Sequence, residues 1–166
     1  GAAAMIESLP DGNVRLALAG TFVPSYLPKQ LKKLENWDKV DELGFLPRDG
    51  ISSLYAESLA GVVVLQGGQG FEETLPIKLF EYMAASLPVI CSNFPIWREV
   101  IKEAKCGLLV DDADTASIRN AYLQIISDPI EALNMGRRGN EAVRDRYNWD
   151  SQAIKLTSIY HEILRT

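Results

Sequence analysis

Short apolar runs alternate with longer segments of mixed polarity along this chain of 166 residues. The run Gly61–Leu65 is continuously apolar, which is typical of a strand buried on both faces. Turn residues bound each short run, and this pattern predicts strands rather than helices. The predicted strands are Val14–Ala19, a strand that follows Trp37–Asp41 and ends near Gly44, then Gly61–Leu65, Pro88–Ser92 and Cys106–Val110.

The segments between these runs have helical signals. In one of them, apolar and small residues recur at the i, i+3, i+4 and i+7 positions of a helical face, namely Ile51, Leu54, Tyr55 and Ser58. Trp149 and Ile154 have the spacing of a hydrophobic staple around a helix start at Asp150. The predicted helices are Pro24–Leu34, Asp49–Leu59, one that starts at Thr74-Leu75-Pro76 and carries Glu81 about two turns in, Pro95–Glu103, one capped by Asp114, one from Pro129 that Gly136 and Gly139 interrupt or weaken, and one from Asp150 almost to Thr166.

The order of these elements predicts the fold class. Alternating strands and helices indicate an α/β protein with a doubly wound parallel sheet, helices on both faces, and consecutive helices at the C-terminal end. The length suits one domain, and we expect a single Rossmann-like domain over residues 1–166. The chain opens close to a strand that should be internal to such a sheet, so we expect that the first strand of the domain is absent. Gly1–Met5 reads either as a native helix end or as a cloning remnant.

Composition narrows the classes of function. The net charge is −5 and the apolar content is 47%, which argues against non-specific nucleic-acid binding. The sequence has neither a secretory leader nor an apolar run of about 20 residues, so we expect a cytoplasmic protein. We interpret Cys91 and Cys106 as reduced, buried residues, and expect no zinc or other metal. A basic group on the C-terminal helices reads as a solvated face or as a peripheral membrane contact: Arg137, Arg138, Arg144 and Arg146.

The stretch Gly67–Ser92 is the best candidate for chemistry. A glycine-rich turn runs into a helix N-terminus, where free N–H groups and the helix dipole favour an anionic ligand. In a doubly wound sheet, ligands bind outside the carboxyl ends of the strands, and the loop Gln66–Leu75 lies there. Carboxylates such as Glu73 and Glu81 accept hydrogen bonds from vicinal hydroxyls, so the stretch suits a nucleotide-sugar. The alternatives are a solvated loop charge at Glu73 and a helix-surface pair of Glu81 with Lys78.

The segment LPIKLFEYMAASLPVICSNFPIWREVI, residues 75–101, resembles the signature of glycosyltransferase family 4, also called glycosyl transferases group 1. VRLALAG, VDELGFLPRDGISSLYAESLAGVVVL, CGLLVDDADTASI and MGRRGNEAVRDRYNWDSQA resemble other landmarks of this family in their expected order. The resemblance covers nearly the whole chain. It implies the GT-B architecture, two Rossmann-like domains facing a cleft, and matches this chain to the C-terminal, donor-binding domain.

The resemblance also implies roles for individual residues. The family has two glutamates with seven residues between them at the donor site, and Glu73 and Glu81 have that spacing. Glu81 would bind the ribose of the donor nucleotide, and Glu73 would contact the transferred sugar as the catalytic residue. The implied remainder of the donor site is the backbone of Thr74, Leu75 and Ile77 at the diphosphate, Lys78 near a phosphate, and Gly44, Phe45 and Leu46 beside the base.

The implied reaction is retaining, metal-independent transfer of a hexosyl group from a nucleoside-diphosphate sugar to an acceptor hydroxyl, in glycan or polysaccharide biosynthesis. No cofactor is expected beyond the donor substrate, and an acceptor glycan or lipid-linked sugar would bind through an N-terminal domain.

Some family features are missing from this chain. The basic Arg and Lys pair in and after the first strand of the domain lies outside it, and Gln66-Gly67 replaces the usual Pro-Ser. The isolated chain is therefore expected to be inactive. The alternatives are a non-catalytic nucleotide- or partner-binding module and a sugar-nucleotide epimerase of GT-B architecture.

Overall fold

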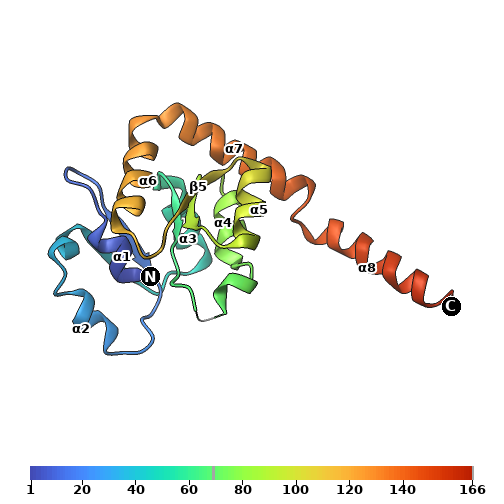
Figure 1. The fold of residues 1–166 in the computed structure, drawn as a ribbon, viewed down its shortest axis with the longest axis horizontal. Coiled ribbons are helices and arrows are strands. Elements are labelled where there is room, and N and C mark those ends of the chain that lie inside the picture. Colours follow the sequence, from blue (N-terminus) through green and yellow to red (C-terminus); the bar gives the residue numbers. More distant parts are fainter. Residues whose placement is uncertain (69, 166) are drawn as a thin grey trace.

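Parallel strands form the centre of the molecule, and helices cover them on both faces (Figure 1). The structure is a computed structural model that describes residues 1–68 and 70–165. Its strands are β1 (Leu16–Ala19), β2 (Val40–Gly44), β3 (Gly61–Val63), β4 (Val89–Ser92) and β5 (Gly107–Val110). These bounds confirm the predicted α/β class, and each predicted strand is present.

The strands of the described residues form two sheets. β1 pairs with β2, with Leu16 opposite Val40, and the second sheet has the order β3-β4-β5, with Gly61 opposite Val89. Both sheets are parallel, as predicted. The strand ladder does not connect β1 to β3 within the described part of the chain.

Two apolar clusters lie on opposite faces of the β3-β4-β5 sheet, and the first of them also includes residues of β1 and β2. One packs α1 (Ala2–Glu7), α2 (Leu27–Leu31) and α6 (Thr115–Ser127) against residues such as Val64 and Ile90. The other packs α4 (Ile77–Ala84) and α5 (Pro95–Ala104) against Val63 and Cys91. Neighbouring strand residues therefore point to opposite faces, as the pleat requires. The helix α7 (Pro129–Asp145) contributes residues to both clusters.

The remaining elements are short or peripheral. They are the helix α3 (Arg48–Glu57), the 3-10 turns η1 (Glu35–Lys39) and η2 (Phe71–Glu73), and the C-terminal helix α8 (Trp149–Ile163). The predicted helix Pro24–Leu34 is only the five residues of α2, of which Leu31 alone is buried. A helix with so little apolar surface has little tertiary support for further turns.

The prediction that glycines interrupt the helix from Pro129 is wrong. α7 is continuous through Gly136 and Gly139, and both glycines are buried. A Cβ at Gly136 would lie 1.9 Å from the carbonyl oxygen of Ser86, and one at Gly139 would lie 3.2 Å from the Cβ of Cys106. The glycines therefore allow α7 to approach the segment after α4 closely, and this packing compensates for their low helix propensity.

The expected hydrophobic staple at the last helix is also wrong. Asn148 is the N-cap of α8, and its side chain accepts a hydrogen bond from the Ser151 N–H at 2.8 Å. Trp149 is 87% exposed and Ile154 is 72% exposed, so neither residue is buried by a staple. Figure 1 shows α8 extending away from the strands and the other helices.

The two cysteines confirm their expected state. Cys91 lies in β4 and Cys106 precedes β5, and both are free and buried. Burial raises the pKa of the Cys91 thiol to about 12 and that of Cys106 to about 11. These thiols are therefore protonated packing groups at neutral pH.

Candidate functional site

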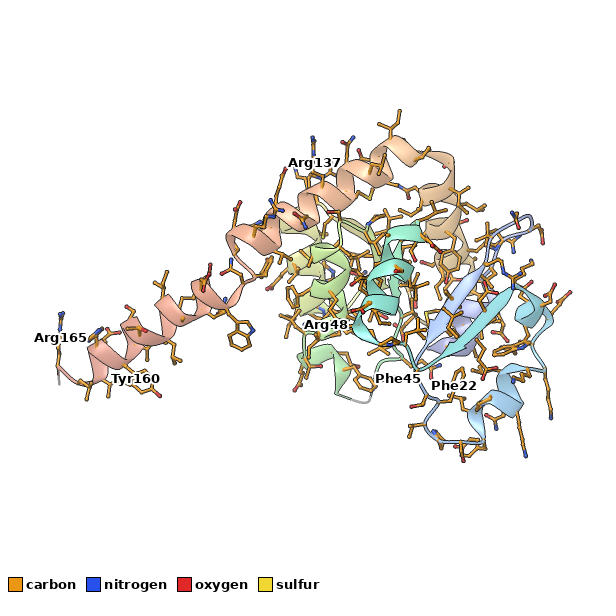
Figure 2. The ribbon with its side chains drawn as sticks, turned by 180° about the vertical axis from the view of Figure 1, so that it is seen from behind. Phe22, Phe45, Arg48, Arg137, Tyr160 and Arg165 are labelled. Atoms are coloured by element: carbon orange, nitrogen blue, oxygen red, sulfur yellow. The ribbon has the colours of Figure 1, made fainter. Side chains whose placement is uncertain are left out.

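The loops that follow β1, β2 and β3 lie at one end of the molecule. The Gly20 N–H donates to the carbonyl oxygen of Gly44 at 2.7 Å, which joins the ends of β1 and β2. Figure 2 shows Phe22, Phe45 and Arg48 along this same end. The carboxyl ends of β1 and β2 therefore meet, and it is outside such strand ends that a parallel α/β sheet binds ligands.

The start of α4 differs from the predicted start. Ile77 is the first helical residue, and Pro76 is the N-cap with an extended backbone, at φ −72° and ψ 134°. Pro76 has no N–H, so the residues that offer amides at the helix start are Ile77 and Lys78, both exposed. Glu81 is the fifth residue of α4, little more than one turn in rather than two. The carboxylate is therefore nearer to the helix N-terminus than the sequence analysis placed it.

The carbonyl before this helix is fixed by a buried tryptophan. Trp97 is fully buried in α5, and its indole N–H donates to the Thr74 carbonyl oxygen at 2.5 Å. The Thr74 hydroxyl donates to the Phe71 carbonyl oxygen at 3.3 Å. Leu75 remains 39% exposed. The backbone that the sequence analysis assigned to the diphosphate is therefore held in place on its inner side and open on its outer side.

The glycine-rich loop is organised by carboxylates that the sequence analysis did not select. The Gly67 N–H donates to Asp112 at 3.0 Å, and the Gly68 N–H donates to Glu72. The hydrogen bond from the Gly68 amide holds the pKa of the Glu72 carboxyl below its usual range. Glu73, the next residue, is exposed at the end of η2. Glu72 therefore shapes the loop, and Glu73 is the carboxylate that faces solvent.

A serine anchors the beginning of this loop. The Oγ of Ser92 accepts a hydrogen bond from the Leu65 N–H and donates one to the Leu65 carbonyl oxygen, each at 2.9 Å. Ser92 is fully buried at the end of β4. One side chain thus continues the connection between β3 and β4 beyond the last paired residue of β3.

Glu81 has a partner from another helix. It lies on the exposed side of α4, and its Oε2 accepts a hydrogen bond from the Tyr55 hydroxyl of α3 at 3.3 Å. The Tyr55 ring meets the Tyr82 ring edge to face at 5.4 Å between centroids. Burial, followed by the Glu81 charge and hydrogen bond, raises the pKa of Tyr55. The tyrosine therefore remains a neutral donor that orients the carboxylate.

Sequence reasoning placed Tyr55 among the residues that recur on one face of its helix but gave it no role at the site. The signal was available in principle, because tyrosine is the one member of that face with an aromatic hydroxyl, and a buried tyrosine hydroxyl usually finds a partner. The hydroxyl points toward Glu81 because of the way α3 packs beside α4. The spacing of residues along the sequence does not reveal that packing.

The turn assigned to the base lies at the end of β2. Gly44 has a left-handed backbone with φ 64°, which a glycine adopts without strain. Phe45 is 80% exposed and Leu46 is half-buried. The turn therefore presents its backbone and one aromatic ring to solvent. Lys78, the residue assigned to a phosphate, lies on α4 and is exposed.

The acidic loop after β5 has structural partners. Asp114 caps α6 by accepting a hydrogen bond from the Ala116 N–H at 2.9 Å, as predicted. Asp111 accepts one from the Ala113 N–H at 3.0 Å. In residues 1–68 and 70–165, histidine, cysteine and acidic side chains form no group of three or more that could hold a metal ion. None of the helices in these ranges is long and apolar enough to cross a membrane.

Comparisons with known proteins identify relatives of this chain. Curated relatives include the D-inositol 3-phosphate glycosyltransferase of Corynebacterium urealyticum, 28% identical over 98% of this chain and 38% of the relative. The phosphatidyl-myo-inositol mannosyltransferase of Mycobacterium leprae is 31% identical over 55% of this chain and 24% of the relative. The chain thus spans well under half the length of these relatives.

Solved structures share the fold. The sucrose-phosphate synthase of Thermosynechococcus elongatus matches 99% of this chain and 41% of its own, with a TM-score of 0.81 and 23% identity. Anabaena Alr3699/HepE, solved in complex with UDP, matches 95% of this chain and 44% of its own, with a TM-score of 0.76 and 17% identity. The model of the family "Glycosyl transferases group 1" matches residues 2–142. This chain therefore belongs to the group 1 glycosyltransferase family.

Proposed function

We propose that this chain is the donor-binding domain of a glycosyltransferase and that it holds a nucleoside-diphosphate sugar at the loops after β2 and β3. The observation that carries the proposal is the position of Glu81, an exposed carboxylate about one turn into α4 and held by the Tyr55 hydroxyl. Carboxylates accept hydrogen bonds from vicinal hydroxyls, and a helix N-terminus favours phosphate. Both features occur within the first five residues of one helix.

The names of relatives support this ligand class. A relative from Mycobacterium tuberculosis, 34% identical over 54% of this chain, is named as a GDP-mannose-dependent mannosyltransferase, and the Anabaena protein was solved with UDP. We propose that Glu81 binds the ribose, that Glu73 contacts the sugar, and that the backbone of residues 74–77 lies along the diphosphate. The Gly44–Leu46 turn would then border the base.

The proposed reaction is retaining transfer of a hexosyl group to an acceptor hydroxyl of a glycan or lipid-linked sugar. The anomeric carbon would pass through an oxocarbenium-like state, as in glycoside cleavage. The nucleoside diphosphate leaves with negative charge, which fixed dipoles and cations stabilise. This chain supplies the amides at the start of α4, and we propose that the cations come from outside it. The isolated chain should then bind the donor nucleotide but transfer no sugar.

Calorimetry with UDP and with GDP tests the binding site. Glu81→Gln removes the charge at constant shape, and binding of the preferred nucleotide should weaken about tenfold or more, because hydrogen bonds to charged groups contribute about 1.5–3 kcal/mol. Glu99→Gln, an exposed change on α5, is the matched control and should leave binding unchanged. Equal binding by the wild type and Glu81→Gln would refute the role of Glu81. If neither UDP nor GDP binds to the wild-type chain, the alternative of a partner-binding module would be favoured.

An assay of the purified chain with UDP-glucose and GDP-mannose tests the reaction. We expect neither sugar transfer nor epimerised donor. Sugar transfer by the 166-residue chain would show that the catalytic groups lie within it. Epimerised donor would favour the epimerase alternative.

A further inference from the structure

The loop after β3 crosses the carboxyl end of a neighbouring strand. β3 and β5 lie on either side of β4, and strands two places apart in a sheet are about 9–10 Å apart. Yet the N–H of Gly67, in the loop after β3, donates to the Oδ2 of Asp112, in the loop after β5, at 3.0 Å. The loop therefore leaves the line of β3 and passes over the end of β4.

Contacts at the end of β4 agree with this path. A Cβ at Gly67 would lie 3.8 Å from the Cε1 of Phe94, which follows β4 closely. The Phe94 side chain is buried, and its ring meets the Trp97 ring edge to face. The loop thus lies on a packed aromatic pair, and Asp112 holds it from the side of β5.

Asp112 lies in a turn that has its own hydrogen bonds. The Asp111 side chain accepts one from the Ala113 N–H at 3.0 Å, and the Asp111 carbonyl oxygen accepts one from the Asp114 N–H at 3.2 Å. The Asp111 N–H donates to the Ser117 hydroxyl of α6 at 3.1 Å. Asp112 is half-buried. Because its turn is anchored to α6, the Asp112 carboxylate is a fixed point for the loop that it holds.

The loop leads from this fixed point to Glu73. The Gly68 N–H donates to the Glu72 carboxylate, so the residue before Glu73 is bonded back to the loop. On the other side of Glu73, the Thr74 carbonyl oxygen accepts the hydrogen bond of the buried Trp97 indole. The Glu73 backbone is therefore held from both directions, while its side chain is exposed.

We propose that Asp112 is a positioning residue of the donor site. By holding the loop across the end of β4, it sets where the Glu73 carboxylate stands relative to Glu81 on α4. The inference rests on the proposed function, in which Glu73 contacts the transferred sugar. Asp112 acts through the Gly67 amide and touches neither part of the donor. Binding of the sugar part should then depend on Asp112, whereas binding of the nucleotide part should not.

Hydrogen exchange tests the hold on the loop without any ligand. In Asp112→Ala the Gly67 amide should exchange about tenfold faster than in the wild type, because its acceptor is gone. Asp112→Asn keeps an acceptor oxygen on a side chain of the same length and should retain most of the protection. Glu99→Ala, an exposed change on α5, is the control and should leave the rate unchanged. An unchanged Gly67 rate in Asp112→Ala would refute the proposal.

Calorimetry with UDP, UDP-glucose, GDP and GDP-mannose tests the role at the site. Asp112→Ala should weaken binding of the preferred nucleotide-sugar about three- to tenfold, the change that loss of one hydrogen bond produces. Binding of the parent nucleoside diphosphate should change by less than about twofold, and Asp112→Asn should restore the affinity for the nucleotide-sugar. A merely structural role would weaken both ligands alike, so equal losses would refute the positioning role.

The outcomes separate this inference from the proposed function. If the nucleoside diphosphate binds and Glu81→Gln weakens it, the donor site stands. Full affinity of Asp112→Ala for the nucleotide-sugar would then overturn the role of Asp112 alone. If the wild type binds none of the four compounds, the proposed function fails and the role of Asp112 fails with it. Should Asp112→Ala not fold, Asp112→Ser, whose shorter side chain withdraws the acceptor, is measured in its place and judged by the same two outcomes.

Discussion

The strands β1 and β4 differ in burial although both are largely apolar. The four residues of β4, Val-Ile-Cys-Ser, are between 0% and 1% exposed. The four residues of β1, Leu-Ala-Leu-Ala, are all only half-buried. β4 has a strand on each side, whereas β1 has one neighbour in the described chain. The difference shows that the burial of a strand depends on whether a strand pairs with it on each side. An apolar sequence alone is not sufficient to bury it.

The largest effect should come from truncating matched leucines in the two regions. Leu79 of α4 is fully buried, and Leu54 of α3 lines a cavity between the β1-β2 sheet and the β3-β4-β5 sheet. Leu79→Ala should lower the free energy of unfolding by about 3–4 kcal/mol, and Leu54→Ala by about 1 kcal/mol or less, because only the first leaves a closed cavity. Urea denaturation of the two variants measures the difference. Similar losses would mean that the cavity beside Leu54 is closed in solution.

A glycine in the packed region should be nearly as sensitive. Gly136→Ala would place a methyl group 1.9 Å from the Ser86 carbonyl oxygen, and backbone on both sides prevents easy relaxation. We expect a loss of about 3 kcal/mol, at the upper end for overpacking. Arg137→Ala, the exposed neighbouring residue, is the control and should cost less than about 0.5 kcal/mol. A Gly136→Ala variant of normal stability would mean that α7 is not in close contact with α4.

Removal of the Tyr55 hydroxyl, which joins α3 to α4 at the site, should have a smaller effect. Tyr55→Phe removes the donor to Glu81 without changing the ring that meets Tyr82. Nucleotide affinity in calorimetry should fall about two- to tenfold, as for the loss of one hydrogen bond of about 1 kcal/mol. Tyr26→Phe, at a residue that is 60% exposed, should leave affinity unchanged. An unchanged affinity for Tyr55→Phe would show that Glu81 does not need this partner.

The smallest effect should come from the ion pair across β1 and β2. Arg15 donates to both carboxylate oxygens of Asp41, at 2.8 and 2.6 Å, and this pairing holds the pKa of Asp41 below its usual value of 3.8. Because the ion pair lowers the pKa of Asp41 in the folded state, it stabilises the fold above about pH 4. This contribution to stability is lost as the pH falls and Asp41 becomes protonated.

The pair is exposed, so Arg15→Gln should shift the urea midpoint by at most about 0.2 M at pH 7 and by less at pH 2.5. A shift of the same size at both pH values would show that Arg15 acts through packing rather than charge. Lys29→Gln, an exposed change on α2, is the control and should shift the midpoint at neither pH.

The sequence predicted the parts of the fold that depend on local signals. The first three residues of the apolar run Gly61–Leu65 form β3, and Asp114 caps α6 as its residue type suggests. The effect of Gly136 was not predictable, since it depends on the approach of a segment 50 residues earlier in the chain. Glu72 and Glu73 are chemically identical neighbours, and only the path of the backbone decides that Glu72 bonds to the Gly68 amide. The Tyr55–Glu81 contact likewise depends on how two helices meet.

Ser92 imposes a requirement on sequence variation. Its hydroxyl is both donor and acceptor to the backbone of Leu65, and no water reaches it in its buried position. An alanine at this position would leave the N–H and C=O of the half-buried Leu65 without these partners, at a cost of about 1–3 kcal/mol in all. A valine would add bulk as well. A saturation library at position 92 should therefore retain serine first and threonine second, because threonine keeps the hydroxyl but adds one methyl group.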